Sequence, residues 1–267
     1  MGEDLQLKRV VELLRALGVR GVLRLERQDP QYHAVCRVLQ HNGEETAARL
    51  AMLNALVSYR LSGKGEEHWG YFGRYFSRRV YDVCAEFLRY VETSPYLRLG
   101  VEARKRRVQK ACGYLPDLED LGNVPDRLAA LLGADRNQKT LVFTIKILNY
   151  VYMCSRGVDR PLPFDIPIPV DYRVAHLTWC AGLIDIPPHE AMRRYREVQE
   201  VWNTISREAG IPPLHIDTVL WLAGRAVLYG ENIHNIPTEI ISAFQWRQEC
   251  RRLSKRRGET SEERSAS

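Results

Sequence analysis

Apolar residues recur along most of the chain at the three- and four-residue spacing of amphipathic helices. Near the start, Leu5, Val10, Leu13 and Leu17 follow this spacing, and Gly18 is the expected stop. Helices are expected over residues 5–17, 30–41, 44–61, 82–91, 101–112, 126–132, 139–153, 171–180, 188–208, 214–228 and 238–253. Few segments alternate as strands do. The pattern predicts an all-α protein.

Prolines interrupt the helical pattern after residue 153, at Pro161, Pro163, Pro167 and Pro169. Proline restricts its own backbone and that of the residue before it, so this stretch is expected to be extended. The last residues, 251–267, are charged and almost free of apolar side chains, and we expect them to form a mobile tail.

The composition is that of an ordinary globular protein, with 267 residues, 45% hydrophobic and 27% charged. This excludes a largely disordered or collagen-like chain. No apolar run approaches the ~18–20 residues that a membrane helix needs. The first residues lack the basic and apolar regions of a signal peptide. We therefore expect a soluble, intracellular protein.

The net charge of +6 favours a polyanionic partner such as nucleic acid without establishing one. Six cysteines are present, and no two have the spacing of a metal knuckle, so zinc and iron–sulfur sites are not expected. Each cysteine is expected to be a small buried hydrophobe with a free thiol, in a reducing compartment.

A short polar turn joins the helices expected over 126–132 and 139–153, and it contains Gly133, Arg136, Asn137 and Gln138. Free backbone N–H groups at a turn and at a helix start suit a phosphate. The same segment is compatible with a plain helical joint and a solvated loop, which the pattern alone favours.

Lys139, Phe143 and Lys146 share one face of the helix that follows this turn. Two lysines flanking an aromatic ring on a largely apolar helix can reach solvent by extending their side chains. Alternatively they line a cleft, where desolvation and mutual repulsion would lower the pKa of an amine and make it nucleophilic.

Asp171 follows the proline-rich segment, where the next helix is expected to begin. Its carboxylate would accept backbone N–H bonds as an N-cap, the simpler interpretation. A fixed carboxylate in this position can also face a reaction centre that becomes positively charged.

Two motifs, Gln138-Lys139-Thr140 after a hairpin and Pro169-Val170-Asp171 before a later helix, resemble those of the helix-hairpin-helix DNA glycosylases. The hairpin departs from that superfamily because it is longer, more polar and lacks a Gly-x-Gly centre, and the proline-rich insert lengthens the spacing from lysine to aspartate. One branch fits these departures, the archaeal 8-oxoguanine DNA glycosylases (AGOG), which have an atypical hairpin, and the chain resembles them from Leu7 to about Trp246. The specific blocks are residues 25–32, 63–69, 138–146, 167–173 and 213–221.

This resemblance implies an all-α, two-lobed helix-hairpin-helix glycosylase fold with an atypical hairpin and no iron–sulfur cluster. It implies a single glycosylase domain over 1–250, with a central lobe at about 50–160 and a second lobe at about 1–49 plus 161–250. The helix-hairpin-helix region would span about 119–183, and the active site would lie between the lobes.

The resemblance also implies a bifunctional DNA glycosylase and abasic-site lyase that excises 8-oxoguanine in base excision repair. Lys139 would attack the deoxyribose C1′ and form a Schiff base, while Asp171 would stabilise the positive sugar. The turn residues Gly133, Arg136, Asn137 and Gln138 would contact the DNA backbone. The 8-oxoguanine pocket would be shaped by Gln31, Ser58, Trp69, Phe143, Lys146, Pro169, Asp217 and Trp221.

No metal or organic cofactor is required for this chemistry, and a monomer acting on DNA that contains 8-oxoguanine is expected. The modified base differs from guanine by an N7–H donor, so one acceptor such as the Gln31 carbonyl could reject guanine.

The residues alone favour simpler interpretations. Trp69 and Trp221 would be core residues, and Gln31 would be exposed to solvent. The basic run Arg104–Lys110 would be a solvated helix face rather than a phosphate-binding surface. A non-catalytic helical module that binds DNA structure or abasic sites, and a helical protein scaffold, stay open as alternatives.

Overall fold

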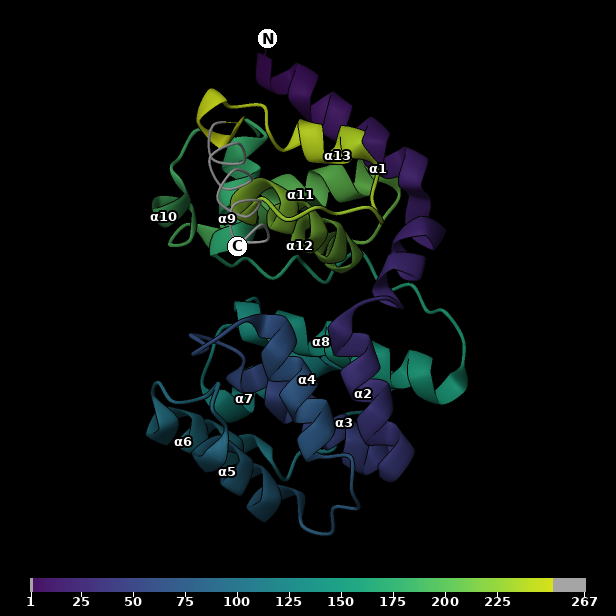
Figure 1. Ribbon diagram of the computed structural model, residues 1–267, viewed down its shortest axis with the longest axis vertical. Coiled ribbons are helices and arrows are strands. Elements are labelled where there is room, and N and C mark those ends of the chain that lie inside the picture. Colours follow the sequence, from purple (N-terminus) through teal and green to yellow (C-terminus); the bar gives the residue numbers. More distant parts are fainter. Residues whose placement is uncertain (1, 252–267) are drawn as a thin grey trace, which may run out of the picture. The chain divides into compact units, whose positions relative to one another are not determined.

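The computed structural model describes residues 2–251 of the chain, and within this range it contains helices and connecting segments but no strand (Figure 1). The expected all-α class is confirmed. The chain divides into two compact units: Met1–Leu25 with Pro161–Ser267, called the N/C unit below, and Glu26–Arg160, called the central unit. The expected mobile tail lies outside the described residues, apart from Arg251.

The boundary between residues 160 and 161 lies where the proline-rich segment begins. The other boundary follows Leu25 rather than lying near residue 49. The reason is packing within the central unit, because the helices at 30–41 and 44–57 both lie against the helix at 139–156. They therefore belong with residues 58–160.

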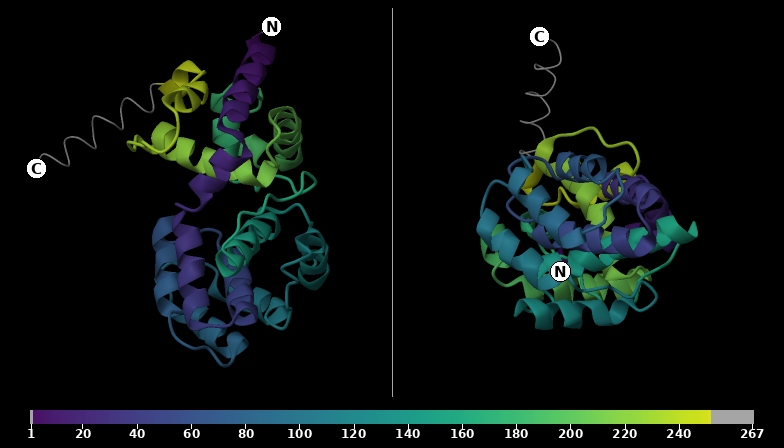
Figure 2. Two further views of the ribbon diagram at one scale, coloured as in Figure 1. Left: turned by 90° about the vertical axis from the view of Figure 1, so that its right-hand side faces the viewer. Right: turned by 90° about the horizontal axis from the view of Figure 1, so that it is seen from below.

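Helices α3 and α8 are buried along most of their lengths and form the core of the central unit. Around them lie α2, α6 and α7, with α4 packed against α2 and α5 against α6 (Figures 1 and 2). The elements of this unit are α2 (Pro30–His41), α3 (Glu44–Val57), α4 (Gly65–Tyr75), α5 (Val83–Thr93), α6 (Val101–Ala111), the 3-10 turn η1 (Leu121–Asn123), α7 (Val124–Leu132) and α8 (Lys139–Arg156).

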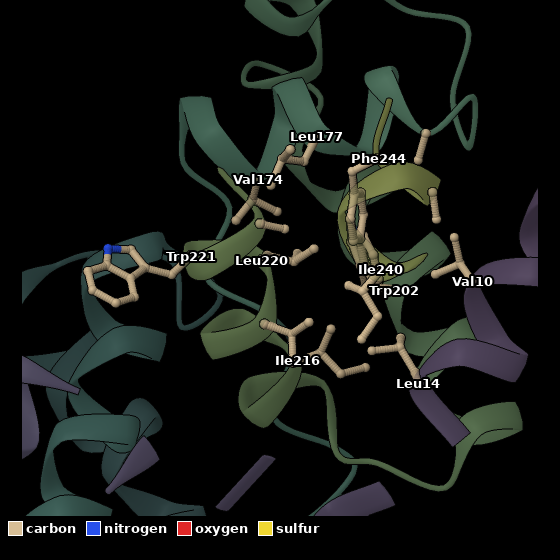
Figure 3. Packing of buried hydrophobic residues seen from close by; sticks show 14 of the residues in the cluster. Val10, Leu14, Val174, Leu177, Trp202, Ile216, Leu220, Trp221, Ile240 and Phe244 are labelled. Atoms are coloured by element: carbon tan, nitrogen blue, oxygen red, sulfur yellow. The ribbon is translucent and has the colours of Figure 1, made fainter. Parts of the chain in front are cut away.

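The N/C unit is organised around α12, which contacts α9, α11 and α13. Its core includes Trp202, Phe244, Ile216 and, from α1, Leu14 (Figure 3). The elements of this unit are α1 (Gly2–Glu26), α9 (Tyr172–Cys180), α10 (Pro188–Ala191), α11 (Tyr195–Ala209), α12 (Pro213–Tyr229) and α13 (Thr238–Ala243).

Three helices of the N/C unit differ from their expected lengths. Gly18, with φ 65° and ψ 165°, kinks α1, but helix resumes beyond it as far as Glu26. The helix expected over 188–208 is broken at residues 192–194 into α10 and α11. The helix expected over 238–253 ends at Ala243, because the chain turns and Arg247 donates its backbone N–H to the Cys180 carbonyl and its Nε–H to the Trp179 carbonyl.

The expectation of free thiols is wrong, because the six cysteines form three disulfides. Cys36 pairs with Cys154, Cys84 with Cys112 and Cys180 with Cys250, at Cα separations of 5.6, 5.3 and 5.8 Å. The partners are 118, 28 and 70 positions apart in sequence, and no local pattern identifies such pairs. Free thiols are the rule in reducing compartments, but intracellular proteins of hyperthermophiles are an exception.

Among the described helices, none combines the length and the apolar character needed to cross a lipid bilayer.

Candidate active site

The expected hairpin is present as α7, a six-residue turn and α8. Gly133 ends α7 in the left-handed conformation, with φ 63°. Within the turn, Asp135 accepts a hydrogen bond from the Asn137 backbone N–H at 2.9 Å, and its carbonyl accepts one from the Gln138 N–H at 3.0 Å. Arg136 pairs with Asp126 on α7 at 3.3 Å, where both side chains are exposed. The turn is thus ordered by its own residues and leads directly into Lys139.

Lys139 is the first residue of α8 and is partly exposed. Its Nζ donates a hydrogen bond to the Ser58 carbonyl at 3.3 Å and lies 5.4 Å from the centre of the Phe143 ring. No carboxylate of the central unit lies within ion-pair distance of this amine. Trp69, on α4, meets Phe143 edge-on at 6.0 Å between ring centres. Two expected pocket residues, Ser58 and Phe143, therefore contact the expected nucleophile, and a third, Trp69, lies against Phe143.

Lys146 does not reach solvent, since its side chain is 2% exposed. Its amine lies 3.9 Å from Oδ2 of Asp29, an equally buried carboxylate. The Tyr150 hydroxyl also donates to Asp29, at 3.1 Å. Burial raises the pKa of the Asp29 carboxyl, while the charge of Lys146 and the hydrogen bonds from Gln31 and Tyr150 act in the opposite direction. Lys146 therefore belongs to a buried polar group that sequence reasoning missed.

Gln31 is positioned by the same aspartate. Asp29 is the N-cap of α2, and its Oδ1 accepts the Gln31 backbone N–H at 2.8 Å. The side-chain carbonyl of Gln31 is buried and has no hydrogen-bond partner. A buried acceptor left in this state can gain a full hydrogen bond from a ligand that brings a donor.

Two arginines of the basic run face inward instead of forming a phosphate-binding surface. Arg104 is buried, its Nε donates to the Val57 carbonyl at 3.2 Å, and its Nη2 donates to the carbonyls of Tyr59 and Arg60. Arg107 donates to the Thr140 hydroxyl at 2.7 Å, next to Lys139. Burial lowers the pKa of both guanidinium groups from the ordinary value. Both arginines hold the segments that carry Ser58 and Lys139.

Asp171 is the N-cap of α9 in the N/C unit, the simpler of the two expectations for it. Its Oδ1 accepts the Val174 N–H at 3.0 Å, and its Oδ2 accepts from Arg173 at 3.1 Å. The preceding segment is buried around Pro169, and Gln199 donates to the Ile168 carbonyl at 3.0 Å, which ties the segment to α11. The carboxylate is thus fixed in one orientation by backbone and side-chain donors.

Asp217 and Trp221 lie one turn apart on α12, as their spacing predicts, and both are buried. The indole of Trp221 points away from the other labelled residues of the N/C core (Figure 3). The Arg225 guanidinium, which pairs with Glu231, lies 5.1 Å from the centre of this ring. Trp221 therefore stands at the edge of the hydrophobic cluster, where a large aromatic face is not needed to fill the core.

Within the described part of the chain, one group of possible metal ligands is closely spaced, namely His176, Cys180 and Cys250, whose ligand atoms lie within 4.8 Å of one another. The two sulfurs are joined in a disulfide and cannot serve as thiolate ligands in that state.

Comparison with known proteins decides the family. A family model described as AGOG, N-glycosylase/DNA lyase, matches residues 11–255. This chain belongs to the AGOG family. An N-glycosylase/DNA lyase of Pyrobaculum aerophilum is 68% identical over 252 residues, which are 94% of this chain and 98% of the relative. One from Methanopyrus kandleri is 34% identical over 226 residues, covering 80% and 88%.

A crystal structure of an AGOG protein also matches the fold. It is the 8-oxoguanine DNA glycosylase from Pyrobaculum aerophilum in complex with 8-oxoguanosine, and it is 68% identical to this chain. The TM-score is 0.90, and the match covers 92% of this chain and 98% of the other. The two-lobed glycosylase fold implied by the sequence motifs is therefore shared with this AGOG structure.

Proposed function

We propose that this chain excises 8-oxoguanine from DNA and then cleaves the strand at the abasic site. The observation that carries the proposal is the environment of Lys139: a partly exposed amine at a helix start, hydrogen-bonded to the Ser58 carbonyl and lying over the Phe143 ring, which Trp69 contacts in turn. A partly exposed amine at this position can be reached by a DNA sugar and, as the free base, can act as a nucleophile. The AGOG relatives and the 8-oxoguanosine complex support the same activity.

The reaction would begin with the lone pair of neutral Lys139. Nζ forms a bond to the deoxyribose C1′, and the N-glycosidic bond breaks with its electron pair leaving on the base, which takes up a proton. The amine then loses one proton, and the C1′–O4′ bond breaks with its electron pair leaving on O4′, which takes up a proton, so that a protonated imine joins Nζ to C1′. Loss of a proton from C2′ then expels the 3′ phosphate and cuts the strand. The Asp171 carboxylate would stabilise the positive charge on the sugar and assist these proton transfers.

Recognition of the base would use its N7–H, which guanine lacks. The buried carbonyl of Gln31 supplies an acceptor without a partner. We propose that the excised base is also bound by Ser58, Trp69, Phe143, Lys146, Pro169, Asp217 and Trp221. Gly133, Arg136, Asn137 and Gln138 would contact the DNA backbone at the helix start, where N–H groups suit phosphates. The enzyme would act inside the cell, as a monomer and without a metal or organic cofactor.

The test uses an oligonucleotide with one 8-oxoguanine and a matched one with guanine. The parent protein should cleave the first, leave the second intact, and form a covalent adduct when borohydride is added. Lys139→Gln should lose the adduct and the cleavage but still bind DNA. A protein that shifts DNA in a gel without forming an adduct is a binding module, and one that does neither is a scaffold; either result would refute the proposal.

A further inference from the structure

His68 is a buried histidine for which the proposed reaction has no direct use. It lies in the first turn of α4, and its side chain is fully buried. The rings of Trp69, Tyr90 and Tyr96 lie 6.0, 6.4 and 6.1 Å from its ring centre. These aromatic contacts fix the orientation of the imidazole.

The hydrogen bonds of Ser58 fix the tautomer of this histidine. The Ser58 hydroxyl donates its single hydrogen to the Asn54 carbonyl at 2.6 Å. The Nε2 of His68 lies 3.0 Å from the same hydroxyl oxygen. Because the hydroxyl hydrogen is already used, Nε2 must carry the proton and donate it to Ser58. Nδ1 is then an unprotonated, buried nitrogen without a partner.

The imidazole is neutral at working pH. Burial, followed by the positive charges of Arg104 and Lys139, lowers the pKa of His68 to about 3. His68 therefore donates one hydrogen bond and adds no charge beside the Lys139 amine.

Ser58 connects this histidine to Lys139. Helix α3 ends at Val57, four residues before the expected end at Leu61, and Ser58 is its C-cap. Arg104 donates hydrogen bonds to the carbonyls of Val57, Tyr59 and Arg60. The carbonyl of Ser58 instead accepts a hydrogen bond from Lys139 Nζ. The side chain and the carbonyl of one capping residue thus join His68 to the amine.

We propose that His68 is a positioning residue, which fixes the Ser58 cap and thereby aims the Lys139 amine at the sugar. This inference rests on the proposed role of Lys139 as the nucleophile. One N–H of the amine is held by the Ser58 carbonyl, so the remaining directions of the nitrogen, including its lone pair, are set by where that carbonyl points. Misplacing a reacting group by about 1 Å can cost about a hundredfold in rate.

The test compares His68→Leu, which cannot donate, with His68→Gln, whose amide N–H can replace Nε2–H. Single-turnover cleavage of the 8-oxoguanine oligonucleotide and the dissociation constant for the same DNA are measured for both. His68→Leu should lower the rate by about 10- to 100-fold with the dissociation constant within about 3-fold of the parent. His68→Gln should recover most of the rate. His41→Leu, at an exposed histidine of the same unit, should match the parent.

A double-mutant cycle tests whether His68 acts through Ser58. In a Ser58→Ala background, His68→Leu should slow the reaction by less than about 3-fold, because the link is already broken. Where His68→Leu does not fold, Ser58→Ala alone should show the loss of rate. Two results would overturn this inference alone, provided that the parent forms the borohydride adduct. One is that His68→Leu reacts at the parent rate, and the other is that His68→Gln is as slow as His68→Leu. A parent without an adduct overturns the proposed function as well.

Discussion

The disulfide between Cys36 and Cys154 joins α2 to α8, the helices that carry Gln31 and Lys139. Replacing both cysteines by serine removes a cross-link between residues 118 positions apart. The chain-entropy relation assigns a loop of this length about 5 kcal/mol of stabilisation at 25 °C. Residual structure in the unfolded chain reduces the observed value, and removal of native disulfides typically costs about 2–5 kcal/mol. We expect a loss within that range.

The assay is unfolding in guanidinium chloride, followed by circular dichroism without reductant. Cys84→Ser with Cys112→Ser is the matched control, because its partners are 28 positions apart and the same relation gives about 3.5 kcal/mol. The first double variant should therefore unfold at a lower denaturant concentration than the second, and both below the parent. If the parent and the variants have the same unfolding midpoint and the same dependence on denaturant, these cross-links do not stabilise the protein. The same conclusion follows if the parent contains six reactive thiols.

Three further predictions concern side chains of the candidate site. Asp171→Asn keeps an oxygen for the Val174 N–H, so the free energy of unfolding should change by less than about 1 kcal/mol. The rate of single-turnover excision should fall about 10²- to 10³-fold, because the charge is lost. Equal excision rates in the parent and this variant would exclude a charge-stabilising role. Gln31→Leu should reduce the preference for 8-oxoguanine over guanine by about 5- to 150-fold, the worth of one buried hydrogen bond, in competition cleavage assays; an unchanged preference would remove Gln31 from recognition. Because the folded-state pKa of His68, about 3, lies below its ordinary value of 6.5, the folded protein binds fewer protons than the unfolded chain between those pH values. As the pH falls from 6.5 towards 3, the free energy of unfolding of the parent should therefore decrease relative to that of His68→Gln. Denaturant midpoints measure this difference, and a difference that does not change with pH would contradict the buried neutral state.

Local features of the site could be predicted from the sequence because they depend on helix geometry. Lys139 and Phe143 are one turn apart on α8, and the side chains meet as the 3.6-residue period requires. Asp171 caps α9, as expected, because a carboxylate before a helix satisfies its free N–H groups. Asp217 and Trp221 are also one turn apart, on α12, because they are four positions apart in the sequence.

Contacts between distant segments could not be predicted in this way. The pairing of Lys146 with Asp29 depends on how α8 packs against α2, and nothing in the local sequence of either helix indicates it. Arg104 and Arg107 look like members of an exposed basic run, yet the packing of α6 places both guanidinium groups against backbone and hydroxyl acceptors. The early end of α3 has the same origin, because the turn after Val57 is held by Arg104.

The link from His68 through Ser58 to Lys139 shows what a motif alone omits. The sequence identifies the lysine, but not the capping residue whose carbonyl receives its N–H. A signal did exist, since His68 lies in the block 63–69 that the family resemblance marks as specific, and Ser58 is one of the pocket residues that the resemblance implies. Only the packed structure shows that their side chains form one hydrogen-bonded chain.

The proposed reaction and the role of His68 both require that Lys139 is the residue that forms a covalent bond to DNA. The most direct measurement is mass spectrometry of the peptides obtained after the parent protein is trapped with borohydride on an 8-oxoguanine oligonucleotide. We expect a reduced sugar attached to the peptide that contains Lys139, at that side chain. Attachment at Lys146, or at any other amine, would contradict it.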